Sequence, residues 1–127
     1  MTCVVINDNN GTWSQTRPIG WVKAARKGYE TFPKAVRDRI NTALTIAAEG
    51  GKADIAKPLK GLELGVMEIA LRHQTGAWRV VYVTEIAGRL WVVHAFGKKS
   101  KTGIKTPKHD IDLVKARLGR LKRGLLQ

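Results

Sequence analysis

The chain has little of several features that mark common protein classes, and each shortage is informative. Cys3 is the only cysteine among 127 residues, so no internal disulfide can form and a cytoplasmic location is expected. No apolar run approaches the roughly 20 residues that span a bilayer, and the N-terminus does not resemble a signal peptide. His73, His94 and His109 are scattered, without acids at metal-ligand spacing, so we expect no metal and no cofactor.

Acidic residues are also few, because 10 Asp and Glu stand against 23 Lys and Arg, giving a net charge of +13. This excess indicates a polyanionic partner, either nucleic acid, an acidic protein or, least supported, an anionic membrane. It increases late in the chain, where residues 98–123 hold ten basic residues and two acids. Folding explains a lysine cluster on a short loop poorly, whereas a phosphate-rich partner explains it well. The clustered lysines are Lys98, Lys99, Lys101, Lys105 and Lys108.

The length and the apolar fraction of 43% are typical of one globular domain with a sizeable core. There is no internal repeat, no low-complexity segment and no Ser/Pro-rich linker. We therefore predict a single domain over residues 1–127.

Helical spacing of apolar residues predicts three helices. Residues 21–29 and 33–47 form the first two, and Gly50-Gly51 ends the second. Because few residues separate them, they are expected to form an αα-hairpin. Pro107 begins a third helix, with apolar residues on one face to residue 121.

Runs of β-branched and aromatic residues predict the strands. Residues 2–6 form the first, and residues 13–18 are a possible edge segment. Residues 66–72, 78–85 and 90–96, joined by short glycine-containing connectors, predict an antiparallel meander. Its middle strand is apolar at both alternations, as in a strand covered on both faces. The predicted fold class is α+β: a small twisted antiparallel sheet, with the αα-hairpin and the C-terminal helix packed on one face.

Several motifs resemble the RelE/ParE superfamily of type II toxins, in its phage-associated HigB-like branch. The most specific is His94-Ala-Phe-Gly-Lys-Lys-Ser-Lys-Thr-Gly-Ile-Lys-Thr-Pro-Lys108, followed by a helix beginning near Asp110. The resemblance covers about residues 20–122. One departure is that Ala70-Leu71-Arg72-His73 follows Glu68-Ile69, where many relatives carry acids or an arginine two residues after the Glu. The other matching motifs are Lys57-Pro-Leu-Lys-Gly-Leu62, Gly65-Val-Met-Glu-Ile69 and Trp78-Arg-Val-Val-Tyr82.

This resemblance implies a RelE-like fold and a metal-independent endoribonuclease that usually cleaves mRNA in the ribosomal A site, inhibiting translation and growth. It also implies a cognate antitoxin, commonly of helix-turn-helix type, that silences the toxin. Two alternatives remain open. One is a non-nucleolytic ParE-like topoisomerase poison on the same scaffold, and the other is a nucleic-acid-binding module without cleavage activity.

Metal-free RNA cleavage needs a base, an acid and cations that stabilise the phosphorane-like charge. Arg79, on the central strand, is expected to stabilise that charge, with pairing to Glu68 as the structural alternative. Lys98 and Lys99 are expected to hold the scissile phosphate, and a solvated loop is their alternative. His94 is a proton-transfer candidate and, alternatively, a hydrogen-bonded core histidine.

Further basic and aromatic residues are predicted to contact RNA. Tyr82 could stack on a base or donate to phosphate, although a sheet tyrosine is more often structural. The predicted backbone and groove contacts are Arg72, Lys101, Lys105 and Lys108.

Overall fold

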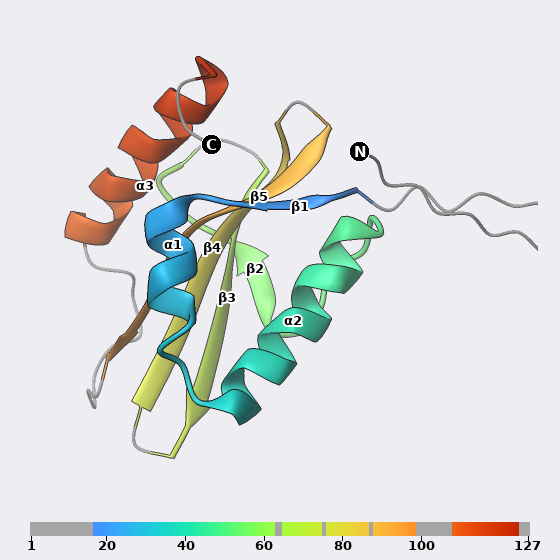
Figure 1. Cartoon of the computed structure of the whole chain (residues 1–127), viewed down its shortest axis with the longest axis vertical. Coiled ribbons are helices and arrows are strands. Elements are labelled where there is room, and N and C mark those ends of the chain that lie inside the picture. Colours follow the sequence, from blue (N-terminus) through green and yellow to red (C-terminus); the bar gives the residue numbers. More distant parts are fainter. Residues whose placement is uncertain (1–16, 63–64, 75, 87, 99–107, 125–127) are drawn as a thin grey trace, which may run out of the picture.

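The computed structural model describes residues 17–62, 65–74, 76–86, 88–98 and 108–124. These residues form a five-stranded sheet with the order β1-β5-β4-β3-β2, and three helices packed on it (Figure 1). The predicted strand at residues 2–6 lies outside the described residues. No helix in the described part of the chain is long and apolar enough to cross a membrane. The elements are β1 Ile19–Trp21, α1 Lys23–Tyr29, α2 Lys34–Ala48, β2 Ala56–Pro58, β3 Val66–His73, β4 Gly76–Ile86, β5 Arg89–Lys98 and α3 Lys108–Lys122.

The predicted meander is confirmed, because β3, β4 and β5 pair antiparallel in sequence order. In one row across the sheet, Val81 of β4 pairs with Glu68 of β3 on one side and His94 of β5 on the other. The register of β4 with β5 shifts between Val81 and Tyr82, as it does at a β-bulge. Residues 79–83 of β4 are all buried, so this strand forms the middle of the core.

The two edge strands differ from the prediction. β1 pairs in parallel with β5, so the sheet is mixed and not wholly antiparallel as predicted. β2 pairs antiparallel with β3 at the other edge. Each edge strand has only three residues, too few for a periodic signal in the sequence. Trp21, predicted to begin the first helix, belongs to β1.

The helices cover both faces of the sheet, which corrects the prediction of a single covered face. Gly28 of α1 lies against Ala95 of β5. Asp110 and Arg117 of α3 instead hydrogen-bond the side chain of His94. Neighbouring residues on a strand point to opposite faces, so α3 and α1 lie on opposite sides of β5. A central strand that is apolar at both alternations requires this arrangement, because either face left uncovered would expose valines to water.

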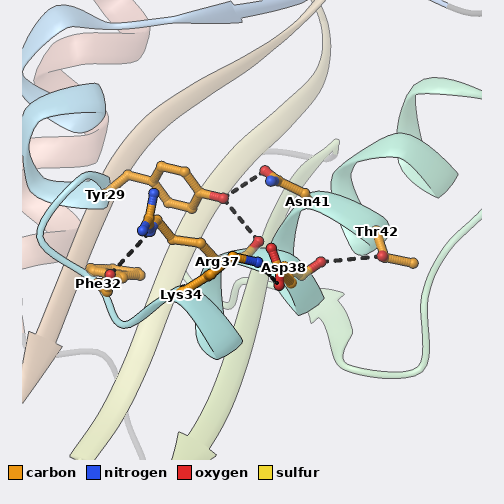
Figure 2. A network of polar contacts seen from close by, with 7 residues as sticks. All are labelled: Tyr29, Phe32, Lys34, Arg37, Asp38, Asn41 and Thr42. Carbon is orange, nitrogen blue, oxygen red and sulfur yellow. Dashed lines mark hydrogen bonds and ion pairs between the residues drawn. The ribbon is translucent and has the colours of Figure 1, made fainter.

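A polar network holds the junction between α1 and α2 (Figure 2). The Tyr29 hydroxyl donates to the Arg37 carbonyl oxygen at 2.9 Å and also contacts the Asn41 side chain, while Arg37 Nε donates to the Phe32 carbonyl at 3.1 Å. Burial raises the pKa of Tyr29, so the phenol stays protonated. Trp21 packs on Tyr29 with ring centroids 4.8 Å apart. The predicted αα-hairpin is therefore fixed by both hydrogen bonds and aromatic packing.

Two helical glycines give a test of how closely α1 approaches the sheet. A Cβ at Gly28 would lie 2.6 Å from the Ala95 carbonyl oxygen, so Gly28→Ala should destabilise the fold by about 1–3 kcal/mol. A Cβ at Gly119 of α3 would meet only the end of the Arg123 side chain at 3.4 Å. Gly119→Ala should therefore stabilise by about 0.5–1 kcal/mol, the usual gain in helix propensity. Urea unfolding measures both changes, and a stabilising Gly28→Ala would contradict the close packing.

Candidate functional site

A cleft of about 680 Å³ opens on the face of the sheet that α3 covers. Its walls come from β2, β3 and β4 and from the first turn of α3. The volume lies within the range of about 300–1,000 Å³ that is usual for ligand sites. Five cations and one carboxylate line it, so its charge is strongly positive. These charged residues are Lys57, Lys60, Glu68, Arg72, Arg79 and Lys108.

The pairing of β3 with β4 brings together residues that are distant in the sequence. Ala70 is opposite Arg79, and Arg72 is opposite Ala77. Because side chains alternate along a strand, Glu68, Ala70 and Arg72 all lie on the cleft face. Arg72 stands two residues beyond the position at which many relatives carry an arginine, and it lies on the same face of the sheet as that position.

Arg79 and Glu68 form a buried ion pair, with Nη1 and Oε2 2.8 Å apart and the residues 8% and 6% exposed. The structural alternative given for Arg79 is therefore present. Both residues nevertheless line the cleft. An anion entering the cleft meets a guanidinium already held at its floor, where the low dielectric strengthens any charge–charge contact. The pair positions Arg79 and also balances its charge while the cleft is empty.

His94 is a packed histidine that lies outside the cleft lining and is 8% exposed. Its Nδ1 lies 3.3 Å from Arg117 Nη1, and because a guanidinium can only donate, Nδ1 accepts. Nε2 therefore carries the proton and donates to Asp110 Oδ1 at 2.7 Å. Burial lowers the pKa of His94, an effect that the bond to Asp110 partly offsets. Both ring nitrogens are engaged in holding α3 to β5, which is the arrangement expected of the hydrogen-bonded core histidine, the alternative to a proton-transfer role.

The remaining predicted residues separate into four groups. Arg72 and Lys108 are exposed and line the cleft. Lys98 pairs in register with Ala77, so its backbone lies in the same row of the sheet as Arg72. Tyr82 is 1% exposed, and burial raises its pKa. A contact between Tyr82 and RNA is therefore corrected, because the ring lies in the core. The lysines that lie outside the described residues are Lys99, Lys101 and Lys105.

Lys57 and Lys60 line the cleft without having been predicted as site residues. In the register of β2 and β3, Lys57 lies opposite Glu68. The side chains of Lys57 and Lys60 are both exposed. The signal that could have identified them is the Lys-Pro-Leu-Lys motif directly before the meander. Within the described ranges, no three His, Cys, Asp or Glu residues gather closely enough to hold a metal.

The lowered pKa of His94 predicts a dependence of stability on pH. The unfolded histidine, with its ordinary pKa of 6.5, binds a proton more readily than the folded one, so acid favours unfolding. Stability should fall as the pH drops through 6.5 and level off below the folded-state pKa. His94→Gln should remove this component between pH 5 and 8. Urea unfolding of both proteins over that range measures it, and parallel profiles would contradict the assignment.

Comparisons with known proteins identify a matching family and proteins of similar structure. A model of the family described as phage-derived Gp49-like proteins matches residues 29–119. The E. coli toxin RelE in the free state, an arginine double mutant, is similar in structure, with a TM-score of 0.57 and 16% identity; the match covers 84% of this chain and 98% of that one. A chain of the toxin–antitoxin complex RelBE2 from Mycobacterium tuberculosis matches with a TM-score of 0.46 and 13% identity, over 67% and 94%.

No protein of curated function matches the chain in sequence. The RelE likeness is one of fold, and it confirms the predicted α+β class. The family match spans α2, β2, the whole meander and most of α3, and therefore includes every residue that lines the cleft. The chain belongs to the phage-derived Gp49-like family and has the fold of RelE-type toxins.

Proposed function

We propose that this protein is the toxin of a type II toxin–antitoxin system and that it cleaves mRNA on the ribosome without a metal. The observation that carries the proposal is the cleft, where Arg79 lies at the floor and four exposed cations surround it. Such a site suits the phosphates of RNA, which supply most of the binding energy in many nucleic-acid complexes. The RelE-like fold and the family motifs support the same activity.

Cleavage would begin with attack of a ribose 2′ oxygen, whose proton passes to water, on the adjacent phosphorus. The bond from phosphorus to the 5′ oxygen then breaks, and the departing 5′ oxygen takes a proton from water, leaving a 2′,3′-cyclic phosphate. Arg79 is placed to stabilise the charge that develops on the phosphoryl oxygens. Lys98 and Lys99, at and beyond the end of β5, are proposed to hold the scissile phosphate. Proton transfer by side chains contributes roughly 10²–10⁴-fold, so correctly placed cations alone would still give a slow nuclease.

The alternatives are less well supported by the cleft. A topoisomerase poison has no need of an arginine held in a cationic cleft on the sheet. A binding module without cleavage would use exposed cations but would not require the costly burial of Arg79 with Glu68. The geometry thus favours a nuclease over both other readings.

A cognate antitoxin and the ribosome are the proposed partners. An antitoxin that silences the nuclease by covering the cleft would present acidic side chains, because the two surfaces of an interface usually have electrostatic potentials of opposite sign. The helix-turn-helix character of that antitoxin rests on the family resemblance alone, whereas location in the cytoplasm is proposed from the single cysteine.

Arg79 provides the test of the proposed activity. Expression of the wild-type chain in growing bacteria should create new mRNA 5′ ends within translated regions. Arg79→Ala should reduce their formation roughly 10²–10³-fold, as expected for the loss of a transition-state donor. Arg89→Ala, an exposed arginine outside the cleft, serves as the matched control and should cleave normally. Mapping of RNA 5′ ends by sequencing measures all three.

Removal of Arg79 also leaves Glu68 buried without this partner, which could reduce folding. The double variant Arg79→Gln, Glu68→Gln keeps a hydrogen-bonding pair and should be folded but inactive, with circular dichroism as the check. Growth arrest with intact mRNA would overturn the nuclease proposal and favour the topoisomerase poison.

A further inference from the structure

Beside the Arg79–Glu68 ion pair, part of the floor of the cleft is apolar, and its rim is cationic. Ala70 of β3 and Ala77 of β4 lie on the cleft face as diagonal neighbours across the strand pair. Both are partly exposed, as is Ile111, which faces the same cleft from α3. Leu59, at the β2 side, also lines the cleft, as do Pro58, Leu71 and Trp78. The two small side chains therefore leave an apolar surface, free of long side chains at these two positions, beside the buried Arg79.

Phosphate binding alone does not account for this floor. A phosphate needs cations and N–H donors, which the rim supplies, and gains nothing from alanine methyl groups. A volume of about 680 Å³ also exceeds what surface phosphate contacts require. An apolar surface left open to water is more stable when an apolar ligand covers it. The faces of an unpaired nucleobase are flat and apolar, whereas its edges and its backbone are polar.

We propose that the cleft binds one unpaired nucleobase of single-stranded RNA against the floor formed by Ala70 and Ala77, with Ile111 closing over it. This rests on the proposed function, and it makes the two alanines specificity-determining residues for the substrate. Single-stranded RNA is read through bases that are splayed out of their stack, so a base is available to enter.

The cations at the rim lie where the RNA backbone would run on either side of the bound base. Lys57 and Lys60 lie on the β2 side, and Lys108 lies on the α3 side, with the floor between them. Phosphates on either side of the seated nucleotide can therefore contact cations at the same time. The seated base fixes the register of the backbone over Arg79, and a correctly placed phosphate reacts faster than a freely sliding one.

The test uses mRNA in which single nucleotides lack their base. Ribosomes are programmed with messages that carry an abasic ribose at the first, second or third position of the A-site codon. Removal of the base keeps every phosphate, so one position should show cleavage slower by about tenfold or more, a loss comparable to that of one stacked base. Equal cleavage at all three positions would overturn the proposal.

Variants of the floor test the same contact from the protein side. Ala77→Leu and Ala70→Leu place a larger side chain into open cleft volume, so they should fold while slowing cleavage of intact mRNA about tenfold. With either variant, the abasic message should show little further loss, because the seat is already filled. Ala35→Leu, at an exposed position on α2, is the matched control and should leave the rate unchanged. If the losses in cleavage rate caused by the leucine variant and by the abasic message were additive, a direct contact between the alanines and the base would be contradicted.

A second readout separates this inference from the proposed function. If wild-type protein fails to cleave intact mRNA, fluorescence anisotropy compares its binding to a short single-stranded RNA with and without an abasic position. Weaker binding of the abasic RNA would support binding of a base against Ala70 and Ala77, even if the nuclease proposal fails. Equal binding, or no binding of either RNA, would overturn the seat as well.

Discussion

The pairing of β3 with β4 determines which side chains reach the cleft. With Ala70 opposite Arg79, strand alternation places Glu68, Arg72 and Ala77 on the same face and sends Trp78 and Val80 toward the helical hairpin. A slip of one residue in β4 would exchange these two sets, burying valines under α3 where Arg79 now lies. The hydrophobic core therefore selects the register, and the register assembles the site. Packing and function are not independent in this sheet.

Within that frame, the ion pair between Arg79 and Glu68 is the most expensive feature of the site. Two charges taken out of water lose hydration energy that their mutual attraction only partly returns. Hydrophobic residues of similar size would often be equally stable there. The pair is better understood as a way of keeping a guanidinium at the floor of a cleft, where a phosphate oxygen can take over from a carboxylate oxygen. Both are anionic acceptors that suit the same fork of N–H donors.

Much of the fold could be predicted from the sequence, because long periodic segments specify their own structure. The meander, α2 and α3 are of this kind. The three-residue strands β1 and β2 could not be predicted, since they exist only through pairing with distant partners. The side on which α3 packs was mispredicted, although the apolar pattern of β4 already demanded cover on both faces.

The site shows the same division between local and long-range information. Arg72, Arg79 and Lys108 were predicted from charge and from their place on elements, and all three line the cleft. The sequence leaves two roles open for His94, because it cannot show that the two ring nitrogens meet Asp110 and Arg117 across the β5–α3 interface. Lys57 and Lys60 belong to a recognisable motif, but only the pairing of β2 with β3 shows that this motif lies at the cleft.

The parallel strand β1 has a consequence for the order in which the sheet can form. Ile19 pairs with Leu90, more than half the chain away, whereas each step of the meander joins neighbouring segments through a short connector. Closing a long loop costs more entropy than closing a short one, and only three residues are there to offset it. The meander can thus assemble from local contacts, while the β1 edge must wait until β5 exists. The strands that bear the cleft can therefore form early in folding, whereas β1 joins the sheet late.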